Sequence, residues 1–337
     1  MRLTFPLKIS SQLYCHHNTL LSYQTLIKKN YYIQVMKSNI DVSIIIINYN
    51  TIDLTIESIN SVYTHTKGIK YEIIVIDNAS KEGMLHIIKD TFPEVILVEN
   101  KTNLGFGNAN NLGIQLAKGE FIFLLNSDAF LTSNALLTFT TYMRQPQNDH
   151  VAVCGGELFT GRLDTTVSYG NLPSLLDAFS SIGFFKLYKK YHYKYIASGV
   201  ANTDPTTREV GYISGADMFI RKSVMDQAGT FDKDFFLYFE ETEMAFRFKQ
   251  KGFISVILPH VKIIHLGSAS QKGKNSFNYV NFFHFCRGRN LYFLKCHGKI
   301  YSLLTRCCYA LNEINLSLIG KRNGNIFKKL NSIFFAK

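Results

Sequence analysis

Short, largely apolar runs that end abruptly in polar residues recur along the first half of the chain. The clearest are Val42–Ile47, Glu72–Ile76 and Phe121–Leu125, in which β-branched and aromatic residues dominate. They lack the strict alternation of polar and apolar positions that marks a strand with one wet face. Runs of this length and composition are typical of strands buried on both faces, as in a parallel sheet covered by helices.

The segments between these runs have helical periodicity. Ile52, Ile56 and Ile59 recur at the spacing of one helix face, and Leu112 and Leu116 do the same after the next strands. Alternation of strands and helices predicts an α/β fold, with a mostly parallel central sheet flanked by helices. We also expect helices over 83–90, 131–143 and 240–252, and strands over 95–98, 151–155, 210–213, 217–221 and 254–258.

Residues 157–210 are weakly patterned and contain several Gly and Pro residues. A connection of this length inside a compact domain is usually functional or disordered. We interpret it as an insertion that faces the substrate, with a helix near 174–185.

Asn126, Ser127 and Asp128 directly follow the apolar run Phe121–Leu125. In open α/β sheets, ligands bind outside the carboxyl ends of the strands. A divalent cation held by a carboxylate and by substrate phosphates suits that position. The alternative is a solvated turn, because Asn, Ser and Asp are common turn formers.

A second stretch with candidate chemistry is Phe235–Phe248, in which Glu240, Glu241 and Glu243 follow an aromatic cluster. Carboxylates in the first turn of a helix are favoured by the helix dipole, and this structural effect alone can explain the three glutamates. The functional alternative is a general base held against apolar walls.

Two further features are open to two interpretations. His265 follows an apolar run and is either structural or a metal ligand near Asp128. The segment Asn103–Asn111 contains Gly105 and Gly107, which permit close approach of a ligand to the backbone, or simply form a tight loop before a helix. Its spacing matches neither a dinucleotide fingerprint nor a P-loop.

The charge distribution changes the picture more than the net charge of +12 does. Of 37 basic and 25 acidic residues, residues 1–40 and 281–337 together hold 15 basic residues against Glu313 alone, which leaves 22 and 24 between them. A nucleic-acid reader more often carries its basic patch on the folded domain, so we expect no nucleic-acid partner. Basic flanks interleaved with aromatic residues suit an anionic membrane surface.

The flanks also suggest the domain boundaries. Residues 1–40 have no sustained period, and we expect a poorly ordered extension in which the functional start is Met36. Residues 276–337 form a basic, aromatic, helical region. Its predicted helix over 279–310 either packs against the domain or lies on the membrane. No apolar run approaches the roughly 18–20 residues of a spanning helix, and the six cysteines contain no CxxC pair, which favours a reducing, cytoplasmic location.

The order of these motifs resembles that of the inverting family 2 glycosyltransferases with the GT-A fold, and most closely their rhamnosyltransferase-like branch. The resemblance covers roughly residues 40–290, and we place the GT-A domain at 41–275. Each motif is weak alone, but their shared order is specific. The motifs are VSIIIINYN at 42–50, EIIVIDNAS at 72–80, NLGFGNANNLG at 103–113, FIFLLNSD at 121–128, GADMFIR at 215–221, the stretch 235–248, and His265.

The resemblance implies a role for each matching residue. Asp128 and His265 would bind Mg²⁺ or Mn²⁺, and Glu241, beside Glu240, would be the catalytic base. The other implied contacts are to the nucleotide, by Asn50, Asp77, Asn78, Asn103, Gly105 and Asn108, and to the donor or acceptor sugar, by Asn126, Gly215, Ala216 and Glu243. Two departures stand out: Asn126 replaces the first Asp of the family's DxD motif, and Glu241 replaces the commoner Asp.

We therefore expect a metal-dependent hexosyltransferase-class enzyme at the cytoplasmic face of the cell membrane, where it builds bacterial surface polysaccharide. It would move a sugar, with rhamnose as the candidate, from a dTDP- or UDP-sugar to a lipid-linked saccharide. One base and in-line attack give inversion, and no retaining pair of carboxylates is evident. The alternatives are a sugar-nucleotide nucleotidyltransferase, whose Gly-rich phosphate loop is missing after residue 47, and a non-catalytic nucleotide-sugar-binding protein.

Overall fold

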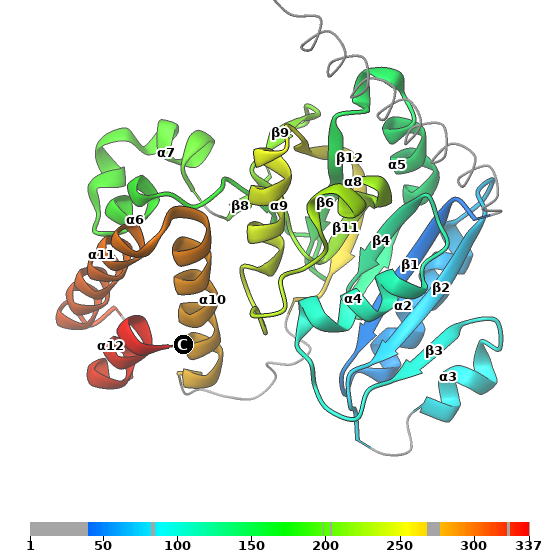
Figure 1. The fold of residues 1–337 in the computed structure, drawn as a ribbon, viewed down its shortest axis with the longest axis horizontal. Helices are drawn as coiled ribbons and strands as arrows, with labels where there is room; N and C mark the ends of the chain where they lie inside the picture. The colour runs from blue at the N-terminus through cyan, green and yellow to red at the C-terminus, as the bar shows by residue number, and fades with distance from the viewer. Residues whose placement is uncertain are drawn as a thin grey trace, which may run out of the picture. The chain divides into compact units, whose positions relative to one another are not determined.

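The computed structural model describes residues 40–81, 85–197, 199–202, 204–267, 277–321 and 324–336. The predicted N-terminal extension with its start at Met36, and most of the polar segment after Gly267, lie outside these residues. In the described part, one large sheet has the strand order β3-β2-β1-β4-β11-β6-β12-β5, and β9 also pairs with β12 (Figure 1). Its strands are β1 (Val42–Asn48), β2 (Tyr71–Asp77), β3 (Ile96–Glu99), β4 (Phe121–Leu125), β5 (Ala129–Leu131), β6 (Val151–Phe159), β9 (Arg208–Val210), β11 (Asp217–Arg221) and β12 (Ile254–His265).

The apolar runs do form the centre of this sheet. Strands β1, β2, β3 and β4 are mutually parallel, as predicted, and β6 is parallel to β12. Four pairings are antiparallel: β11 pairs with β4 and with β6, and β12 pairs with β5 and with β9. The sheet is still mostly parallel, with the antiparallel β11 inserted near its middle and β5 and β9 running against β12.

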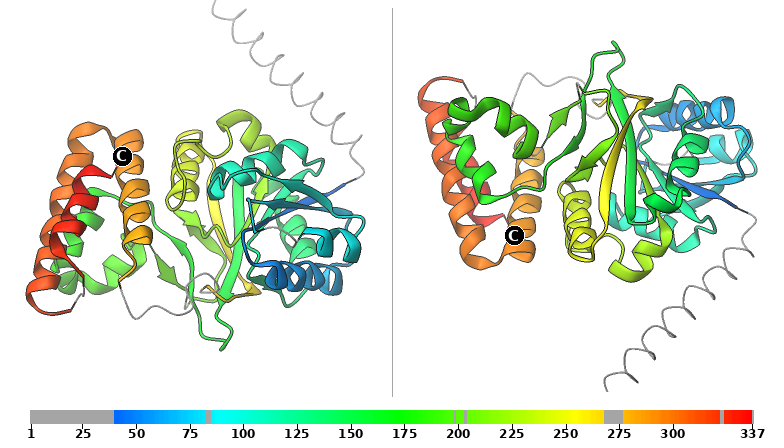
Figure 2. Two further views of the ribbon diagram at one scale, coloured as in Figure 1. Left: turned by 90° about the horizontal axis from the view of Figure 1, so that it is seen from below. Right: turned by 90° about the horizontal axis from the view of Figure 1, so that it is seen from above.

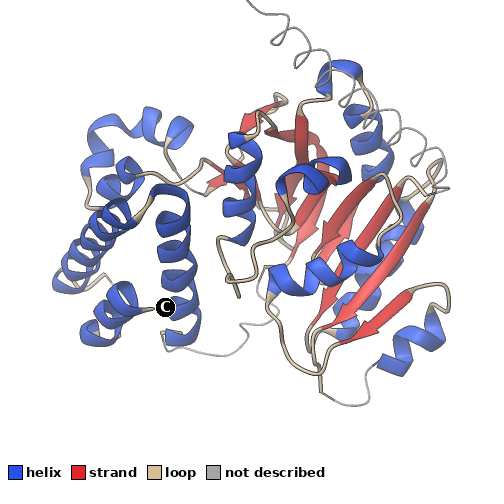
Figure 3. Cartoon of the chain, viewed as in Figure 1, coloured by secondary structure: helices blue, strands red, loops and turns tan. Residues whose placement is uncertain are grey.

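Helices cover both faces because side chains alternate along each buried strand. On one face, Val42, Ile44 and Ile46 pack with residues of α2 (Ile52–His65), α3 (Leu85–Thr91) and α5 (Ala135–Met143). On the other, Ile45 packs with residues of α4 (Phe106–Leu116), α8 (Lys222–Ala228) and α9 (Glu240–Gln250). Figure 3 shows this arrangement of helices around the strands.

Two predicted boundaries were wrong because long-range pairing overrides local pattern. Leu131 belongs to strand β5. The helix predicted from 131 begins only at Ala135, after a loop of residues 132–134. The strand predicted to end at Leu258 continues to His265 as β12, with a register shift on β6 between Leu258 and Lys262. Pro259 lies in that irregular stretch, where a missing ladder donor is tolerated.

The insertion 157–210 is structured rather than loop-like. It contains β7 (Val167–Gly170) and β8 (Val200–Ala201), which form a small sheet with β10 (Tyr212–Ile213) in the order β10-β7-β8. The helix expected near 174–185 is present as α6 (Leu175–Ser181), followed by the 3₁₀ helix η2 (Phe184–Tyr188) and by α7 (Lys189–Tyr195). A second 3₁₀ helix, η1 (Pro146–Asn148), precedes β6.

The C-terminal region is helical, as predicted, but it is not one continuous helix. Gly298, with φ 91°, separates α10 (Tyr279–His297) from α11 (Lys299–Leu318), and α12 (Ile326–Phe335) follows. Helix α11 packs against α6, α10 and α12, so α6, η2 and α7 of the insertion and the C-terminal helices α10, α11 and α12 form a single helical lobe (Figure 2). Among the described residues, no helix combines the length and the apolar character needed to cross a membrane.

Inside this lobe, Lys329 of α12 is fully buried and its Nζ lies 3.3 Å from Oε2 of the buried Glu313 on α11. The aliphatic part and ammonium of Lys329 also lie over the ring of Phe277, with Nζ 4.5 Å from its centroid. A buried charge is tolerated only while its partner compensates it.

We therefore expect Glu313→Gln to lower the free energy of unfolding by about 3–5 kcal/mol, because it leaves the Lys329 ammonium uncompensated. The double change Glu313→Leu with Lys329→Met removes both charges and should cost clearly less than the single change. Urea denaturation followed by circular dichroism measures both. Equal losses for the single and double variants would show that the ion pair is not the source of the stability.

Candidate functional site

Three polar side chains lie at the carboxyl ends of adjacent parallel strands. Asn48 ends β1, Asp77 ends β2, and Asn126 follows β4. Asn48 and Asp77 are paired in register, and Asn48 Nδ2 donates to Asp77 Oδ1 at 2.6 Å. Both side chains are buried, so the polar edge of the sheet is built on an internal hydrogen bond rather than on solvated groups.

Asn48 is a residue that the sequence reasoning missed. Its Oδ1 accepts from Thr55 Oγ1 at 2.9 Å, and its Nδ2 also donates to Ser80 Oγ at 3.1 Å. It thereby joins β1, α2 and the loop after β2. The signal was available, because Asn48 ends its apolar run in the same way that Asp77 and Asn126 end or follow theirs.

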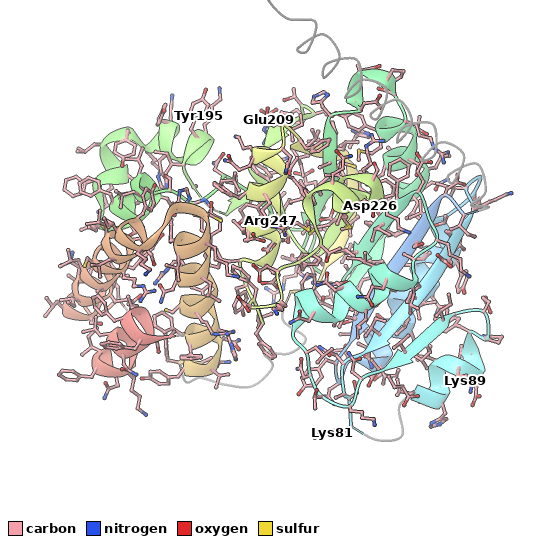
Figure 4. All side chains as sticks on the ribbon, in the orientation of Figure 1. Lys81, Lys89, Tyr195, Glu209, Asp226 and Arg247 are labelled. Atoms are coloured by element: carbon pink, nitrogen blue, oxygen red, sulfur yellow. The ribbon has the colours of Figure 1, made fainter. Side chains whose placement is uncertain are left out.

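Asn50, the predicted nucleotide contact, lies in the exposed loop two residues further on, with φ 56°. Its Oδ1 accepts from the backbone N–H of Lys81 at 3.0 Å, and its own N–H donates to Ser80 Oγ at 2.9 Å. Asn50 therefore links the loops that follow β1 and β2. Figure 4 marks Lys81 in the second of these loops.

Asp128 and His265, the predicted metal pair, lie together. Asp128 Oδ1 is 3.3 Å from His265 Nε2, and Asn126 Nδ2 is 3.4 Å from the same nitrogen. The pairing of β5 with β12 causes this convergence, because His265 is opposite Ala129, the neighbour of Asp128. Asp128 Oδ2 also accepts from the N–H of Gly267 at 3.2 Å.

The donor set fits a small divalent cation bound chiefly by its substrate. The side chains of His265 and Asp128 remain 19% and 16% exposed, so this imidazole and carboxylate are adjacent and partly accessible to solvent. The described residues contain no group of three or more His, Cys, Asp or Glu side chains that could hold a metal alone. Mg²⁺ and Mn²⁺ commonly take one or two protein ligands plus phosphate oxygens and water. Burial raises the pKa of Asp128, but the hydrogen bond and charge of His265 outweigh it and hold that pKa below 3.8.

Asn78 does not have a free group for a nucleotide. Its Nδ2 donates to Asn103 Oδ1 at 2.8 Å and to the carbonyl of Gly105 at 3.3 Å. Its Oδ1 accepts from the N–H of Leu104 at 2.9 Å and from Asn100 Nδ2 at 3.1 Å. These contacts use both donors and both lone pairs of the amide. Asn78 and Asn103 therefore hold the loop before α4 in place, and their predicted role at the nucleotide stays a prediction.

The same loop is joined to the segment before α9. The N–H of Phe106 donates to the carbonyl of Phe236 at 2.9 Å, and Asn108 Nδ2 donates to the carbonyl of Lys233 at 3.1 Å. Gly105 has φ 81°, and a Cβ there would overlap the Phe236 carbonyl, so only glycine allows this approach. Gly105 and Asn108 thus act through the backbone and through loop anchoring.

The predicted sugar contacts Gly215 and Ala216 connect the metal pair to this loop. The carbonyl of Ala216 accepts from the N–H of Asn126 at 3.1 Å. A Cβ on Gly215 would lie 3.1 Å from the ring of Phe106, so the start of β11 is in contact with the first residue of α4. Contacts therefore run without a gap from His265 through Asn126 and Ala216 to Phe106, and on to Phe236.

Helix α9 begins in an unusual way. Tyr238 and Phe239 have φ 71° and 72°, conformations that non-glycine residues seldom adopt, and Glu240 follows at once. Glu240 is 3% exposed, and its Oε2 has no hydrogen-bond partner among the described residues. Burial, and then the charge of Glu241, raise the pKa of Glu240 well above 4.5.

Glu241 is only partly buried, and burial raises its pKa to about 7. Tyr212 of β10 is close enough for the Glu241 charge to raise the tyrosine pKa further, after the larger effect of burial. Two adjacent carboxyl groups with different exposures therefore stand at the start of α9. This arrangement suits a buried neutral acid beside a group that ionises near neutral pH.

Glu243, for which a sugar contact stays a prediction, makes an ion pair within α9. Its Oε1 accepts from Arg247 Nε at 2.7 Å, one turn further along α9. Arg247, marked in Figure 4, also donates to the carbonyls of Ala228, Gly229 and Thr230. Glu243 therefore orients the arginine that ties α9 to the end of α8.

The helical lobe supports this helix start directly. Gly288 of α10 lies against the backbone of Leu237 and Tyr238, and a Cβ at Gly288 would overlap the carbonyl oxygen of Tyr238. The ring of Phe239 packs on Phe285 and Tyr292 of α10, with centroids 5.3 Å and 6.0 Å apart. The left-handed pair before Glu240 is thus held by packing from α10.

With this geometry established, comparison with known proteins finds a family match over part of the chain. Residues 43–202 match the family model described as Glycosyl transferase family 2. Among curated proteins, an N-acetylglucosaminyl-diphospho-decaprenol L-rhamnosyltransferase of Mycobacterium tuberculosis is 25% identical over 209 residues, which is 57% of this chain and 66% of that protein. The hexosyltransferase Agl10 of low-salt glycan biosynthesis in Haloferax volcanii is 23% identical over 216 residues, 63% of this chain and 62% of that protein.

A poly(ribitol-phosphate) beta-glucosyltransferase of Bacillus spizizenii is 34% identical over 113 residues, 32% of this chain and 18% of that protein. The chain thus spans less than two thirds of the length of these curated relatives. Among solved structures, the mannosyltransferase PcManGT of Pyrobaculum calidifontis, in complex with GDP-Man and Mn²⁺, matches with a TM-score of 0.53 and 16% identity over 92% of this chain and 85% of that one. GalNAc-T7 with UDP, GalNAc and Mn²⁺ matches with a TM-score of 0.56 and 14% identity, over 88% and 54%. The likeness confirms the predicted GT-A fold.

We expect Gly288→Ala to destabilise the protein by about 1–3 kcal/mol, because the added methyl pushes α10 away from Tyr238. In a helix interior, alanine would otherwise be the better residue by about 1 kcal/mol. Gly199→Ala is the control, since its methyl meets only ordinary contact with Val167, 3.6 Å away. Thermal unfolding of both variants checks this, and a Gly288→Ala protein as stable as the control would contradict the packing.

The pKa of Glu241 makes a second prediction, about stability. The folded state keeps a proton on Glu241 at pH values where the unfolded chain, with a pKa near 4.5, has lost it. Folding is therefore favoured by this group at low pH, and that contribution is lost as the pH rises from 4.5 through about 7. We expect Glu241→Gln to raise the urea midpoint at pH 8 and to change it little at pH 4.5. The exposed Glu57→Gln should show no such difference, and a pH-independent effect at Glu241 would refute the shift.

Proposed function

Because the chain contains a family 2 glycosyltransferase domain over residues 43–202, we propose that it transfers a sugar from a nucleotide-diphospho-sugar to a hydroxyl of a lipid-linked saccharide, with inversion. The observation that carries the proposal is the joint placement of two elements. The Asp128–His265 pair lies at the carboxyl edge of the sheet, and an unbroken series of contacts connects it to the loop that packs against the start of α9, where Glu241 stands.

The relatives support the choice of substrates. One is named for transfer of L-rhamnose to N-acetylglucosaminyl-diphospho-decaprenol, a lipid-linked saccharide. Two solved neighbours are named with Mn²⁺ and a nucleotide or nucleotide-sugar, GDP-Man in one and UDP in the other. We propose a dTDP- or UDP-sugar as donor, rhamnose as the candidate sugar, and surface-polysaccharide synthesis at the cytoplasmic face of the membrane as the setting.

The polar edge of the sheet would bind the donor. Asp77, fixed by Asn48, and the Asn50 loop would contact the base and ribose, while the loop held by Asn78 would cover the nucleotide through its backbone. Asp128 and His265 would hold Mg²⁺ or Mn²⁺, which stabilises negative charge on the departing diphosphate. Asn126 contributes a neutral amide where a carboxylate is commoner, so the protein adds one negative charge fewer beside that diphosphate.

Glu241 would take the proton from the acceptor hydroxyl. A base with a pKa near 7 is well matched to catalysis at neutral pH, because it is both available in ionised form and basic enough to accept the proton. Glu240, buried and held neutral by its raised pKa, would leave Glu241 as the one charged carboxylate of the pair. A single base acting opposite the leaving group gives inversion.

Replacing the two carboxylates tests the proposal. We expect Glu241→Gln to lower kcat by about 100-fold to 10,000-fold, because proton transfer from the acceptor is lost. Asp128→Asn should lower turnover and raise the Mn²⁺ concentration needed for it. The assay is release of nucleoside diphosphate from a panel of nucleotide-sugars with Mn²⁺ and a lipid-linked acceptor. Glu57→Gln is the control, and wild-type rates in both site variants would exclude this mechanism; release of pyrophosphate instead would favour a nucleotidyltransferase.

The pH profile gives an independent check of the base. Because Glu241 must be ionised, log(kcat/KM) should rise with a slope of about one as the pH increases toward 7, and level off above it. Glu241→Asp should keep such a limb with its midpoint shifted toward lower pH. A flat profile between pH 5.5 and 8 in the wild-type protein, about the range over which this group titrates, would count against Glu241 as the base.

A further inference from the structure

Helix α11 has its polarity inverted relative to a helix of a water-soluble domain. Its buried residues are Ser302, Thr305, Ala310 and Glu313, three of them polar. Its exposed residues are instead large and apolar, with Ile300 and Leu318 both 79% exposed. The exposed set follows helical spacing along one face: Ile300, Leu303, Leu304, Leu311, Ile314 and Leu318.

Helix α12 shows the same inversion in part. Lys329, Ser332 and Ile333 are buried, whereas Phe327 and Phe335 are 78% and 69% exposed. The lobe thus keeps its ion pair inside and presents leucine and phenylalanine outside. Contiguous exposed apolar surface on a soluble protein marks an interaction site.

The insertion extends the same surface. Helix α6 packs on α11, and Leu187 of η2 is 83% exposed. Phe179 and Phe184, each 44% exposed, stack on one another with ring centroids 4.5 Å apart. We call the exposed apolar residues of α6, η2, α11 and α12 the apolar face.

Helix α10 lies between α11 and the sheet in the views of Figures 1 and 2. Two roles were considered for residues 279–310: packing on the domain and lying on a membrane. Helix α10 packs on the domain, whereas the exposed apolar surface belongs mainly to α11.

Charge identifies the occupant. In the described part of the lobe, the two acidic residues are both engaged: Glu313 is buried beside Lys329, and Asp177 accepts from Tyr309 at 3.3 Å. The exposed charged side chains among the same described residues are lysines: Lys186, Lys189, Lys190, Lys194, Lys295, Lys299, Lys321 and Lys328. Two copies joined through this face would bring like charges together, whereas anionic headgroups would neutralise them.

We propose that the apolar face, with its surrounding lysines, docks the helical lobe onto an anionic lipid bilayer. The apolar side chains enter the acyl boundary and the lysines remain at the headgroups, as for an interfacial helix. The docking itself does not require the transferase chemistry. If the proposed function also holds, Gly288 of α10 links the docked lobe to the start of α9, so the base would stand beside the membrane that carries the acceptor.

Vesicle flotation of the full chain tests this. Wild-type protein should float with vesicles of phosphatidylcholine containing about 30% phosphatidylglycerol, and much less with phosphatidylcholine alone. The triple variant Ile300→Ser, Leu304→Ser and Leu311→Ser should bind about tenfold or more weakly. The matched control is Leu116→Ser, Leu137→Ser and Leu163→Ser, three exposed apolar positions outside the lobe, which should bind like wild type.

A second variant separates charge from apolar insertion. Lys186→Ser, Lys189→Ser and Lys190→Ser should lower binding to the anionic vesicles and abolish most of their advantage over neutral ones. Circular dichroism establishes that each variant is folded. Equal binding of wild type and the α11 triple variant would overturn the proposal. So would a stable dimer in sedimentation velocity that the α11 triple variant converts to a monomer, because a second copy would then cover the face. If the wild-type protein floats with the anionic vesicles but shows no sugar transfer in the assay above, the proposed function is rejected and the membrane docking is not.

Discussion

The pairing register of β5 with β12 is the constraint on which the site depends. His265 lies opposite Ala129, and this places its imidazole beside Asp128. The pairing thus brings together two segments that are far apart in the sequence. A slip of one residue would turn His265 to the other face of the sheet and separate the pair. The long contact of β12 with β6, and the further pairing with β9, hold that register against slippage.

A second constraint is backbone-to-backbone packing at two glycines. Gly105 lets the loop before α4 approach Phe236, and Gly288 lets α10 approach Tyr238. Between these two contacts, the chain adopts its left-handed pair at Tyr238 and Phe239 and enters α9. Strained backbone of this kind persists only when its surroundings hold it. The loop before α4 and the helical lobe thus both pack against the segment that leads into α9.

The helical lobe follows a different rule from the sheet domain. The sheet buries β-branched and aromatic side chains, and its polar groups gather at one edge. The lobe buries an ion pair and small polar residues alongside its aromatic and apolar clusters, and it exposes leucine and phenylalanine. Such a surface is costly in water and favourable against lipid. The two regions meet at α9 and α10, so the chemistry and the proposed membrane contact share one junction.

The local pattern of the sequence was sufficient to predict the central strands, the flanking helices and the polar residues at the strand ends. A strand buried on both faces appears in the sequence as a short, continuous apolar run. The motif order also led to the GT-A fold and to the glycosyltransferase family 2 model that matches residues 43–202. The partners of those polar residues depended on tertiary structure. Only long-range pairing brought His265 to Asp128, extended β12 through Pro259 and placed Leu131 in a strand. Only the folded structure showed that the Asn78 amide is fully engaged by its own and neighbouring loops. It also showed that Asn48 connects β1, α2 and the loop after β2, and that Glu243 binds Arg247. Periodicity records which face of a helix is apolar, but whether that face is buried, as in α9, or exposed, as in α11, is decided by what packs against it.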